Sequence, residues 1–467
     1  MSEETDDNSH AHLIIILLGP IVACLVGSLM WFYQPGATDA AITLGVTAWV
    51  VLWWMTEPVP IPVTSLIPLA LLPLTGVLTS QQVGQSYGHP LVLLLMGGFL
   101  LATALERSGA HRRIALNMVR LFGGSSSRRL VFGFMLASAV LSMWISNTAT
   151  VLMLLPVAIA VLDATEDKDL SVPLLLGIAY GASIGGMGTP IGTPPNVVFM
   201  GVYEQTTGAT IGFGTWMSWA LPVVIVLLPI AGFWVTRNLT FKGDFNLPAV
   251  GQWQLREKRV FVVFAITALF WVTRTEPFGG WTAWLGLPYS NDAVVAFLGV
   301  VVLFLVPDGR GEKLLDWDTA NKIPWGMLIL FGAGITIATA FTSSGLSSTI
   351  GASLQGLSAF HALIMIGVIC LSVTFLTEVT SNTATTTLLM PILAAAAIGA
   401  AIDPKLFMIP AALSASCAFM LPVATPPNVV TFSTGRIQIQ RMVREGFALN
   451  LFGVMVISTM TYLILAD

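Results

Sequence analysis

The five-residue sequence Ser-Asn-Thr-Ala-Thr occurs twice in the chain, at residues 146–150 and 381–385. Each copy stands inside an apolar stretch. About 45 residues later each is followed by a second repeated sequence, Thr-Pro-Pro-Asn, at residues 193–196 and 425–428. Polar, helix-breaking residues at matched places in two apolar halves predict two structural repeats with a binding site between them.

Composition places the chain in a class before any motif is used. Of its 467 residues, 55% are hydrophobic and only 9% are charged, whereas a soluble domain carries roughly 25% charged residues. The sequence therefore predicts an all-α polytopic membrane protein. The three cysteines (Cys24, Cys370 and Cys417) lie in apolar segments without metal-ligand spacing, so neither zinc nor disulfides are expected.

Hydropathy predicts eleven transmembrane helices. Residues 1–12 are expected to form a disordered tail, and the basic stretch 106–129 to include an amphipathic helix on the membrane surface. The spans are expected at residues 13–33, 41–56, 62–78, 90–105, 172–203, 216–235, 260–272, 293–306, 325–341, 406–432 and 447–465.

The two apolar blocks around Ser-Asn-Thr, residues 130–163 and 360–401, are each broken near the middle. Half of such a block is roughly 24 Å long as a helix, which is short for a hydrocarbon core of about 30 Å. Each block is either two full spans or one re-entrant hairpin. The uncharged polar turn favours the hairpin, because non-helical backbone at membrane depth is tolerated where it lines a cavity.

The basic residues indicate the orientation of the chain. With the N-terminus in the cytoplasm and the C-terminus outside, all but two of the 20 lysines and arginines face the cytoplasm, the exceptions being Arg274 and Lys405. This skew follows the positive-inside rule. It places the first hairpin on the cytoplasmic side of the membrane and the second on the outer side. We expect a bacterial plasma-membrane location.

The internal repeat extends beyond the two short sequences. Pro156 and Pro391 share the spacing of the Ser-Asn-Thr pair, and Thr-Glu-Pro at residues 56–58 recurs at residues 275–277. After a first span within residues 13–40, we expect repeat 1 at residues 41–240 and repeat 2 at residues 241–467. Five spans per repeat is an odd number, so the second copy is inverted in the membrane.

The repeated residues suit a site that takes both an anion and a cation. Ser, Asn and Thr favour helix N-caps, and the free amides of a helix start attract an anion. Asn and Ser oxygens, together with carbonyls freed by Pro-Pro, are ligands for a small cation. The small residues Gly192 and Ala424 precede the prolines and leave those carbonyls accessible. The alternative is a capped turn and a tolerated kink, which four elements in matched positions disfavour.

These paired motifs, with Trp-x-Thr-Glu-x-x-Pro-Ile-Pro-x-Thr-Ser at residues 54–65, resemble the divalent anion/sodium symporter family, the INDY-like transporters. The resemblance covers the chain from about the second span to its end. It implies a homodimer in which a transport domain, about residues 130–205 and 360–435, moves as an elevator against a scaffold. It also implies sodium-coupled uptake of C4-dicarboxylates such as succinate, malate and fumarate.

The resemblance also implies site residues in this chain. The first sodium site would use Ser142, Ser146, Asn147 and Gly192, and the second Thr377, Thr380 through its backbone, Asn382 and Ala424. The substrate carboxylates would meet Asn147, Thr148, Asn382, Thr383, Thr425 and Pro426. No lysine or arginine lies near either tip in the sequence, which favours a cation-coupled symporter over an exchanger.

A dianion at mid-membrane needs charge compensation, which here would come from helix ends and bound sodium. Two similar tips favour a dicarboxylate over sulfate, while citrate, sulfate and dicarboxylate exchange remain alternatives. An anion channel is disfavoured by the inverted repeat. No Ser/His/Asp set or acid pair suggests an enzyme. We expect sodium as the co-transported ion, membrane lipid and a second copy of this chain as partners, and neither an organic cofactor nor nucleic acid.

Three acidic residues need an interpretation. Glu378, close to the second tip, would either hold a proton or tune the cation site, or be a structural acid bonded to nearby backbone, and we favour the structural role. Glu57 and Glu276 are related by the repeat at two span ends, and we interpret both as structural.

Overall fold

The computed structural model describes residues 3–122, 126–165, 167, 169–241, 245, 247, 251–353 and 361–465, with side chains from residue 13 onward. Lys168 and Lys242, both expected on the cytoplasmic side, and residue 360 of the expected second hairpin lie outside these residues. Within the described residues the regular structure is helical, apart from one isolated bridge between Pro307 and Lys313. The all-α prediction is confirmed.

The first two helices, α1 (Glu3–Tyr33) and α2 (Thr38–Thr56), form an antiparallel pair. Small residues let their backbones approach closely, since a Cβ added at Gly45 would lie 2.6 Å from the Ala23 carbonyl oxygen. Helix α1 begins at Glu3, inside the stretch expected to be a tail.

The expected span 62–78 is wrong as a single helix. It forms α3 (Ile61–Thr64) and α4 (Ile67–Leu74), because Pro62 and Pro68 each stand in the first turn of a new helix. The rest of repeat 1 comprises α5 (Ser80–Tyr87), α6 (Pro90–Ser108), α7 (Ala110–Phe122), α8 (Ser127–Ser142), α9 (Asn147–Ala164), α10 (Ser171–Gly186), α11 (Pro194–Thr207) and α12 (Phe213–Thr236).

Repeat 2 follows the same plan of paired and broken helices. It comprises α13 (Leu255–Val272), α14 (Gly280–Trp284), α15 (Asp292–Leu305), α16 (Trp317–Ala320), α17 (Trp325–Ser343), α18 (Leu346–Ser353), α19 (Ala362–Leu376), α20 (Asn382–Gly399), α21 (Lys405–Ser414), the 3-10 turn Pro422–Ala424, α22 (Pro426–Phe432) and α23 (Ile439–Leu465).

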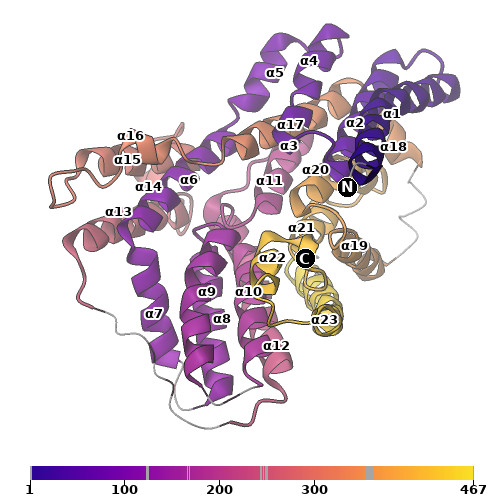
Figure 1. Cartoon of the computed structure of the whole chain (residues 1–467). Helices are drawn as coiled ribbons and strands as arrows, with labels where there is room; N and C mark the ends of the chain where they lie inside the picture. Colours follow the sequence, from indigo (N-terminus) through magenta and orange to yellow (C-terminus); the bar gives the residue numbers. More distant parts are fainter. Residues whose placement is uncertain are drawn as a thin grey trace.

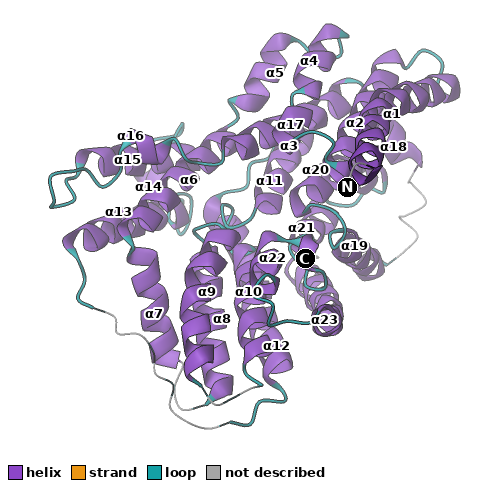
Figure 2. Ribbon diagram, in the orientation of Figure 1, coloured by secondary structure: helices purple, strands orange, loops and turns teal. Residues whose placement is uncertain are grey.

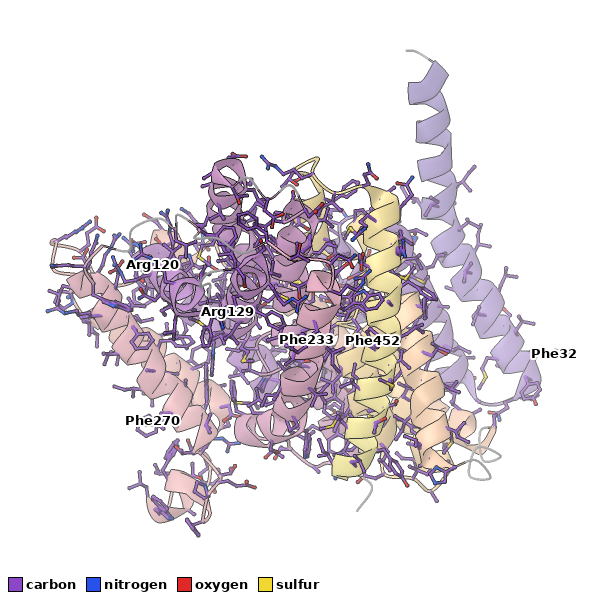
Figure 3. All side chains as sticks on the ribbon, turned by 90° about the horizontal axis from the view of Figure 1, so that it is seen from below. Phe32, Arg120, Arg129, Phe233, Phe270 and Phe452 are labelled. Atoms are coloured by element: carbon purple, nitrogen blue, oxygen red, sulfur yellow. The ribbon has the colours of Figure 1, made fainter. Side chains whose placement is uncertain are left out.

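Eight helical segments in the described part of the chain are long and apolar enough to cross a membrane, with α5 and α6 counted together, and five shorter segments are also apolar, with α3 and α4 counted together. Figure 3 shows α1, α12, α13 and α23 running across the molecule, marked by Phe32, Phe233, Phe270 and Phe452. Helix α1 begins at one end of the molecule and α23 ends at the other. The chain is therefore an integral membrane protein with many helices, as its composition predicts.

The two blocks around Ser-Asn-Thr are helical hairpins, α8–α9 and α19–α20, each with its break at the expected place. In the second hairpin Met365 of α19 packs with Ala396 and Ala397 of α20. The expected spans 172–203 and 406–432 are broken into α10–α11 and α21–α22. Figure 1 shows these broken helices at the centre of the molecule, between the hairpins, with α9 against α22 and α20 against α11.

Helix α10 is buried on all sides, which fits its uniformly apolar sequence. It contacts α8 through glycine, and a Cβ at Gly185 would lie 2.2 Å from the Ala139 carbonyl oxygen. A separate apolar cluster joins α2, α4, α5 and α17. The central broken helices are thus held by close packing, and α17 contributes residues to both clusters, such as Phe331 to the central one and Ala333 to that of α2.

Candidate functional site

Both hairpin tips and both Pro-Pro breaks open into one cavity of about 640 Å³, within the usual size of a small-molecule site. In Figure 2 these unwound segments are the loops between the central helices. The cavity is lined by all six residues expected to meet substrate: Asn147, Thr148, Asn382, Thr383, Thr425 and Pro426. Of the residues expected to bind sodium, Ser146, Asn147, Gly192, Thr380, Asn382 and Ala424 also line it.

The two tips start their returning helices differently. At the first tip, the Ser146 hydroxyl accepts a hydrogen bond from the Ala149 amide at 3.1 Å and caps α9, as predicted. At the second tip Ser381 occupies the N-cap position of α20 but makes no side-chain cap. The expected cap is therefore wrong for the second copy, and the first amides of α20 have no capping side chain.

Ser142 and Thr377, both expected as sodium ligands, are fully buried behind the tips and do not line the cavity. Each hydroxyl bonds to the tip asparagine of its own hairpin: Ser142 to Asn147 Oδ1, and Thr377 to Asn382 Oδ1 at 2.6 Å. Thr377 Oγ1 also lies 3.0 Å from the Ala415 carbonyl oxygen. One hydroxyl proton serves both acceptors, so this cluster is rich in oxygen and poor in donors.

A matching cluster lies behind the first tip. A Cβ added at Gly186 would lie 2.8 Å from Asn147 Oδ1 and 3.2 Å from the Gly192 carbonyl oxygen. A Cβ at Gly192 would lie 2.5 Å from the Gly186 carbonyl oxygen. Glycine at position 186 therefore leaves room for the Asn147 side-chain oxygen and the Gly192 carbonyl oxygen to approach the same point. Oxygens of these two kinds are ligands that a small hard cation accepts.

The asparagine that closes each Thr-Pro-Pro-Asn sequence holds the unwound backbone before it. Asn196 Nδ2 donates to the carbonyls of Gly186 at 3.0 Å and Thr189 at 2.7 Å. In the second repeat Asn428 Nδ2 donates to the carbonyls of Ala418 at 2.9 Å and Leu421 at 3.0 Å. Sequence reasoning missed this positioning role, although the repeated asparagine was the signal for it.

Glu378 is buried behind the second tip and bonds to the backbone of the second break, as the structural interpretation predicts. Its carboxylate accepts from the amides of Phe419 at 2.7 Å, Met420 at 2.9 Å and Leu421 at 3.0 Å. Asn450 Nδ2 of α23 donates to the same carboxylate at 2.7 Å. This bonding fixes the position of the second break relative to the hairpin and α23.

The remaining wall comes from α6, from the end of α2 and from the start of α17. The Trp54 indole donates to the Ser65 hydroxyl at 3.1 Å and orients this end of α2. Of the described residues that line the cavity, none is Lys, Arg or His, and one, Glu57, is charged. Glu276, which the internal repeat relates to Glu57, does not line the cavity. The purely structural interpretation therefore does not account for Glu57.

Two relatives resemble this chain over most of its length. The sodium-dependent dicarboxylate transporter SdcS of Staphylococcus saprophyticus is 38% identical over 487 residues, covering 98% of this chain and 92% of the relative. The protein of the same name from Staphylococcus aureus (strain MRSA252) is 38% identical over 484 residues with the same coverage.

Two solved structures share the fold at 13% sequence identity. The Alcanivorax borkumensis YdaH transporter has a TM-score of 0.62, covering 90% of this chain and 97% of that one. Neisseria gonorrhoeae MtrF has a TM-score of 0.58, covering 84% of this chain and 83% of that one. These likenesses concern architecture alone.

The family described as the sodium:sulfate symporter transmembrane region matches residues 11–465 of this chain. The match spans nearly the whole sequence, including both hairpins and both Pro-Pro breaks. The chain therefore belongs to the divalent anion/sodium symporter family, whose members are membrane transporters and not enzymes.

Proposed function

We propose that this protein is a secondary active symporter that imports C4-dicarboxylates such as succinate, malate and fumarate together with sodium. The observation that carries the proposal is the single cavity in which both Ser-Asn-Thr tips and both Pro-Pro breaks meet. The relatives named sodium-dependent dicarboxylate transporters support both the cation and the substrate class.

The two oxygen clusters behind the tips are the proposed sodium sites. The first comprises Ser142, Ser146, Asn147 and Gly192, and the second Thr377, Thr380, Asn382 and Ala424. Both clusters consist of hydroxyl, amide and carbonyl oxygens without a carboxylate, which suits a monovalent hard cation better than a divalent one. Within the described residues no group of His, Cys, Asp and Glu could hold a transition metal.

The substrate would lie between the tips, with one carboxylate at the start of α9 and the other at the start of α20. Asn147, Thr148, Asn382 and Thr383 stand at these helix starts and line the cavity. Thr425 Oγ1 is buried, at the cavity wall, and has no hydrogen-bond partner among the described residues. A polar atom left unpaired beside a cavity supports a ligand contact there.

The tip asparagines link the two kinds of site. In each, the Oδ1 atom faces the oxygen cluster behind the tip, and the same amide group carries the Nδ2 donors that an anion would use. Sodium bound to Oδ1 polarises the amide and strengthens donation from Nδ2. Binding of either ion therefore favours the other, which is the thermodynamic basis of symport.

We further propose a homodimer and an elevator motion of residues 130–205 and 360–435 against the scaffold. The cavity wall combines tips from the moving part with the end of α2 and the start of α17, which belong to the scaffold in this proposal. On the topology proposed from the basic residues, the lining ends of α2 and α17 face the cytoplasm. The present cavity would then open inward, with the N-terminus inside and the C-terminus outside.

Transport of labelled succinate into proteoliposomes tests this function. We expect uptake that is driven by an inward sodium gradient and lost when choline replaces sodium. Counterflow of succinate would distinguish a carrier from an anion channel, which does not show it. Inhibition of succinate uptake by malate and fumarate but not by sulfate or citrate would support a dicarboxylate substrate. Selective inhibition by sulfate or by citrate would instead identify that anion as the substrate.

A further inference from the structure

The described part of the chain gives the wall of the proposed anion-binding cavity one carboxylate, that of Glu57. A negative charge does not favour the binding of an anion. Glu57 is at the end of α2, it is exposed and it lines the cavity. Its side chain makes no hydrogen bond or ion pair with any residue that the structure describes. An unpaired negative charge in this position repels the proposed substrate.

Glu57 also contradicts two local preferences of helix C-termini, one of backbone conformation and one of charge. The residue has φ 46° and ψ 46°, the left-handed conformation that helix C-termini usually give to glycine or asparagine. An acidic residue at a helix C-terminus is also unfavourable, because that end of the helix dipole is negative. When one residue contradicts two local preferences and makes no hydrogen bond or ion pair with the described residues, a role in function is the simplest reason.

The internal repeat does not explain this conformation. Glu276 stands in the corresponding Thr-Glu-Pro sequence of repeat 2, but its φ is not positive and it does not line the cavity. Glu57 and Glu276 thus share a motif and differ in environment. Glu276 is therefore a matched control for Glu57.

We propose that Glu57 is the residue that sets the electrostatic selectivity of this cavity. Its carboxylate and the negative end of α2 together attract sodium and repel anions in proportion to their charge. The inference rests on the proposed function, since it assigns the selectivity of a cavity that takes sodium and a dicarboxylate. Glu57 acts through its charge on the bound ions and is no ligand of either proposed sodium site.

The size of the cavity sets the expected effect. A volume of about 640 Å³ places a bound ion within roughly 10 Å of the wall, a separation at which one unit charge changes the affinity of a dianion about threefold at moderate ionic strength. The same charge changes the affinity of a trianion about fivefold, because the interaction scales with ligand charge. Glu57 would therefore favour succinate over citrate.

The test uses the full-length protein in detergent at constant ionic strength, with choline balancing sodium. Glu57→Asn removes the charge and tolerates the left-handed backbone, Glu57→Asp keeps the charge, and Glu276→Gln removes the related charge outside the cavity. Thermal stabilisation by sodium alone gives a sodium midpoint without substrate. Calorimetry at saturating sodium gives the affinities for succinate and citrate.

We expect Glu57→Asn to raise the sodium midpoint about 1.7-fold, since sodium carries half the charge of the dianion, and to tighten succinate about threefold and citrate about fivefold. Glu57→Asp and Glu276→Gln should behave like the wild type. The proposal is overturned if Glu57→Asn leaves the midpoint and the citrate-to-succinate ratio unchanged, if Glu57→Asp behaves like Glu57→Asn, or if Glu276→Gln shifts both values equally.

The same measurements separate this inference from the proposed function. A wild type that is stabilised by sodium but binds neither acid contradicts the proposed substrate, and the sodium midpoints still decide the role of Glu57. A wild type that binds the acids equally well without sodium contradicts sodium coupling. In that case the change in the citrate-to-succinate affinity ratio in Glu57→Asn still decides the role of Glu57.

Discussion

The Thr377 hydroxyl donates a hydrogen bond of 2.6 Å to Asn382 Oδ1, and Ser142 makes the equivalent bond to Asn147 in the other repeat. Each tip asparagine is thus held by a hydroxyl five residues earlier, on the opposite arm of its hairpin. The side-chain oxygen is engaged by this buried hydroxyl, and the amide nitrogen is left for another partner. This orientation is common to both repeats, although the hairpins differ in their caps.

Thr377→Val should raise the sodium concentration for half-maximal stabilisation about tenfold. The variant keeps the shape of the side chain but removes one proposed ligand and releases Asn382, a loss of about 1–3 kcal/mol for a buried hydrogen-bonded group. Sodium titrations by thermal shift check this. Thr374→Val is the control, because Thr374 is buried one turn earlier and its hydroxyl has no partner among the described residues. Equal effects of the two variants would refute the assignment.

Asn147→Ala and Asn382→Ala should each abolish sodium-driven succinate uptake while leaving a folded protein. Each change removes an amide proposed to contact both ions, and both residues line the cavity. Uptake in proteoliposomes is the measurement, with size-exclusion profiles as the test of folding. Asn117→Ala, an exposed position on α7, should transport normally. Near-normal uptake by either tip variant would remove that asparagine from the site.

Glu378→Gln should lower the melting temperature of the protein. A glutamine of the same shape offers one acceptor atom in place of two, so its NH₂ group meets an amide donor and leaves it unpaired. The expected loss is about 1–3 kcal/mol. Differential scanning calorimetry checks it, with the exposed Glu276→Gln variant expected to melt like the wild type. An unchanged melting temperature would show that the bonds at Phe419, Met420 and Leu421 contribute nothing net.

Glu257, outside the predicted spans at the start of α13, gives a pH-dependent contribution to stability. Burial raises the pKa of this carboxyl, but bonds from the Arg113 guanidinium and the Gln254 amide outweigh burial and hold it below its usual range. A lowered folded pKa means that the stabilisation is complete above the unfolded pKa of about 4.3 and is lost as pH falls through the folded value.

The pH dependence can be measured with Glu257→Gln. The variant should melt at a lower temperature than the wild type at pH 7, and the difference should shrink as the pH falls below about 4. A difference that is constant between pH 7 and pH 3.5 would show that the ion pair with Arg113 is not its source.

Several features of the fold follow from local sequence alone. The apolar composition determined that the chain enters a membrane, since too few charged residues exist to cover a soluble surface. The repeated Ser-Asn-Thr and Thr-Pro-Pro sequences determined where four helices break, because proline and capping residues act on the backbone beside them. Prolines at residues 62 and 68 also divide the third expected span into two helices. Hydropathy did not indicate this break, because it averages over a window and ignores the effect of proline on the backbone.

Other features depended on contacts between distant segments. Sequence spacing does not show that Asn450 meets Glu378, 72 residues away, or that Ser142 and Thr377 lie behind the tips rather than in the cavity. Nor does it distinguish Glu57, which lines the cavity, from Glu276, which has the same neighbours in sequence. Periodicity and composition report burial and backbone preference at each position, whereas the meeting of particular atoms depends on how the helices pack. The sequence determined the site's components, and the tertiary structure decided which oxygens face a cation and which charge faces the cavity.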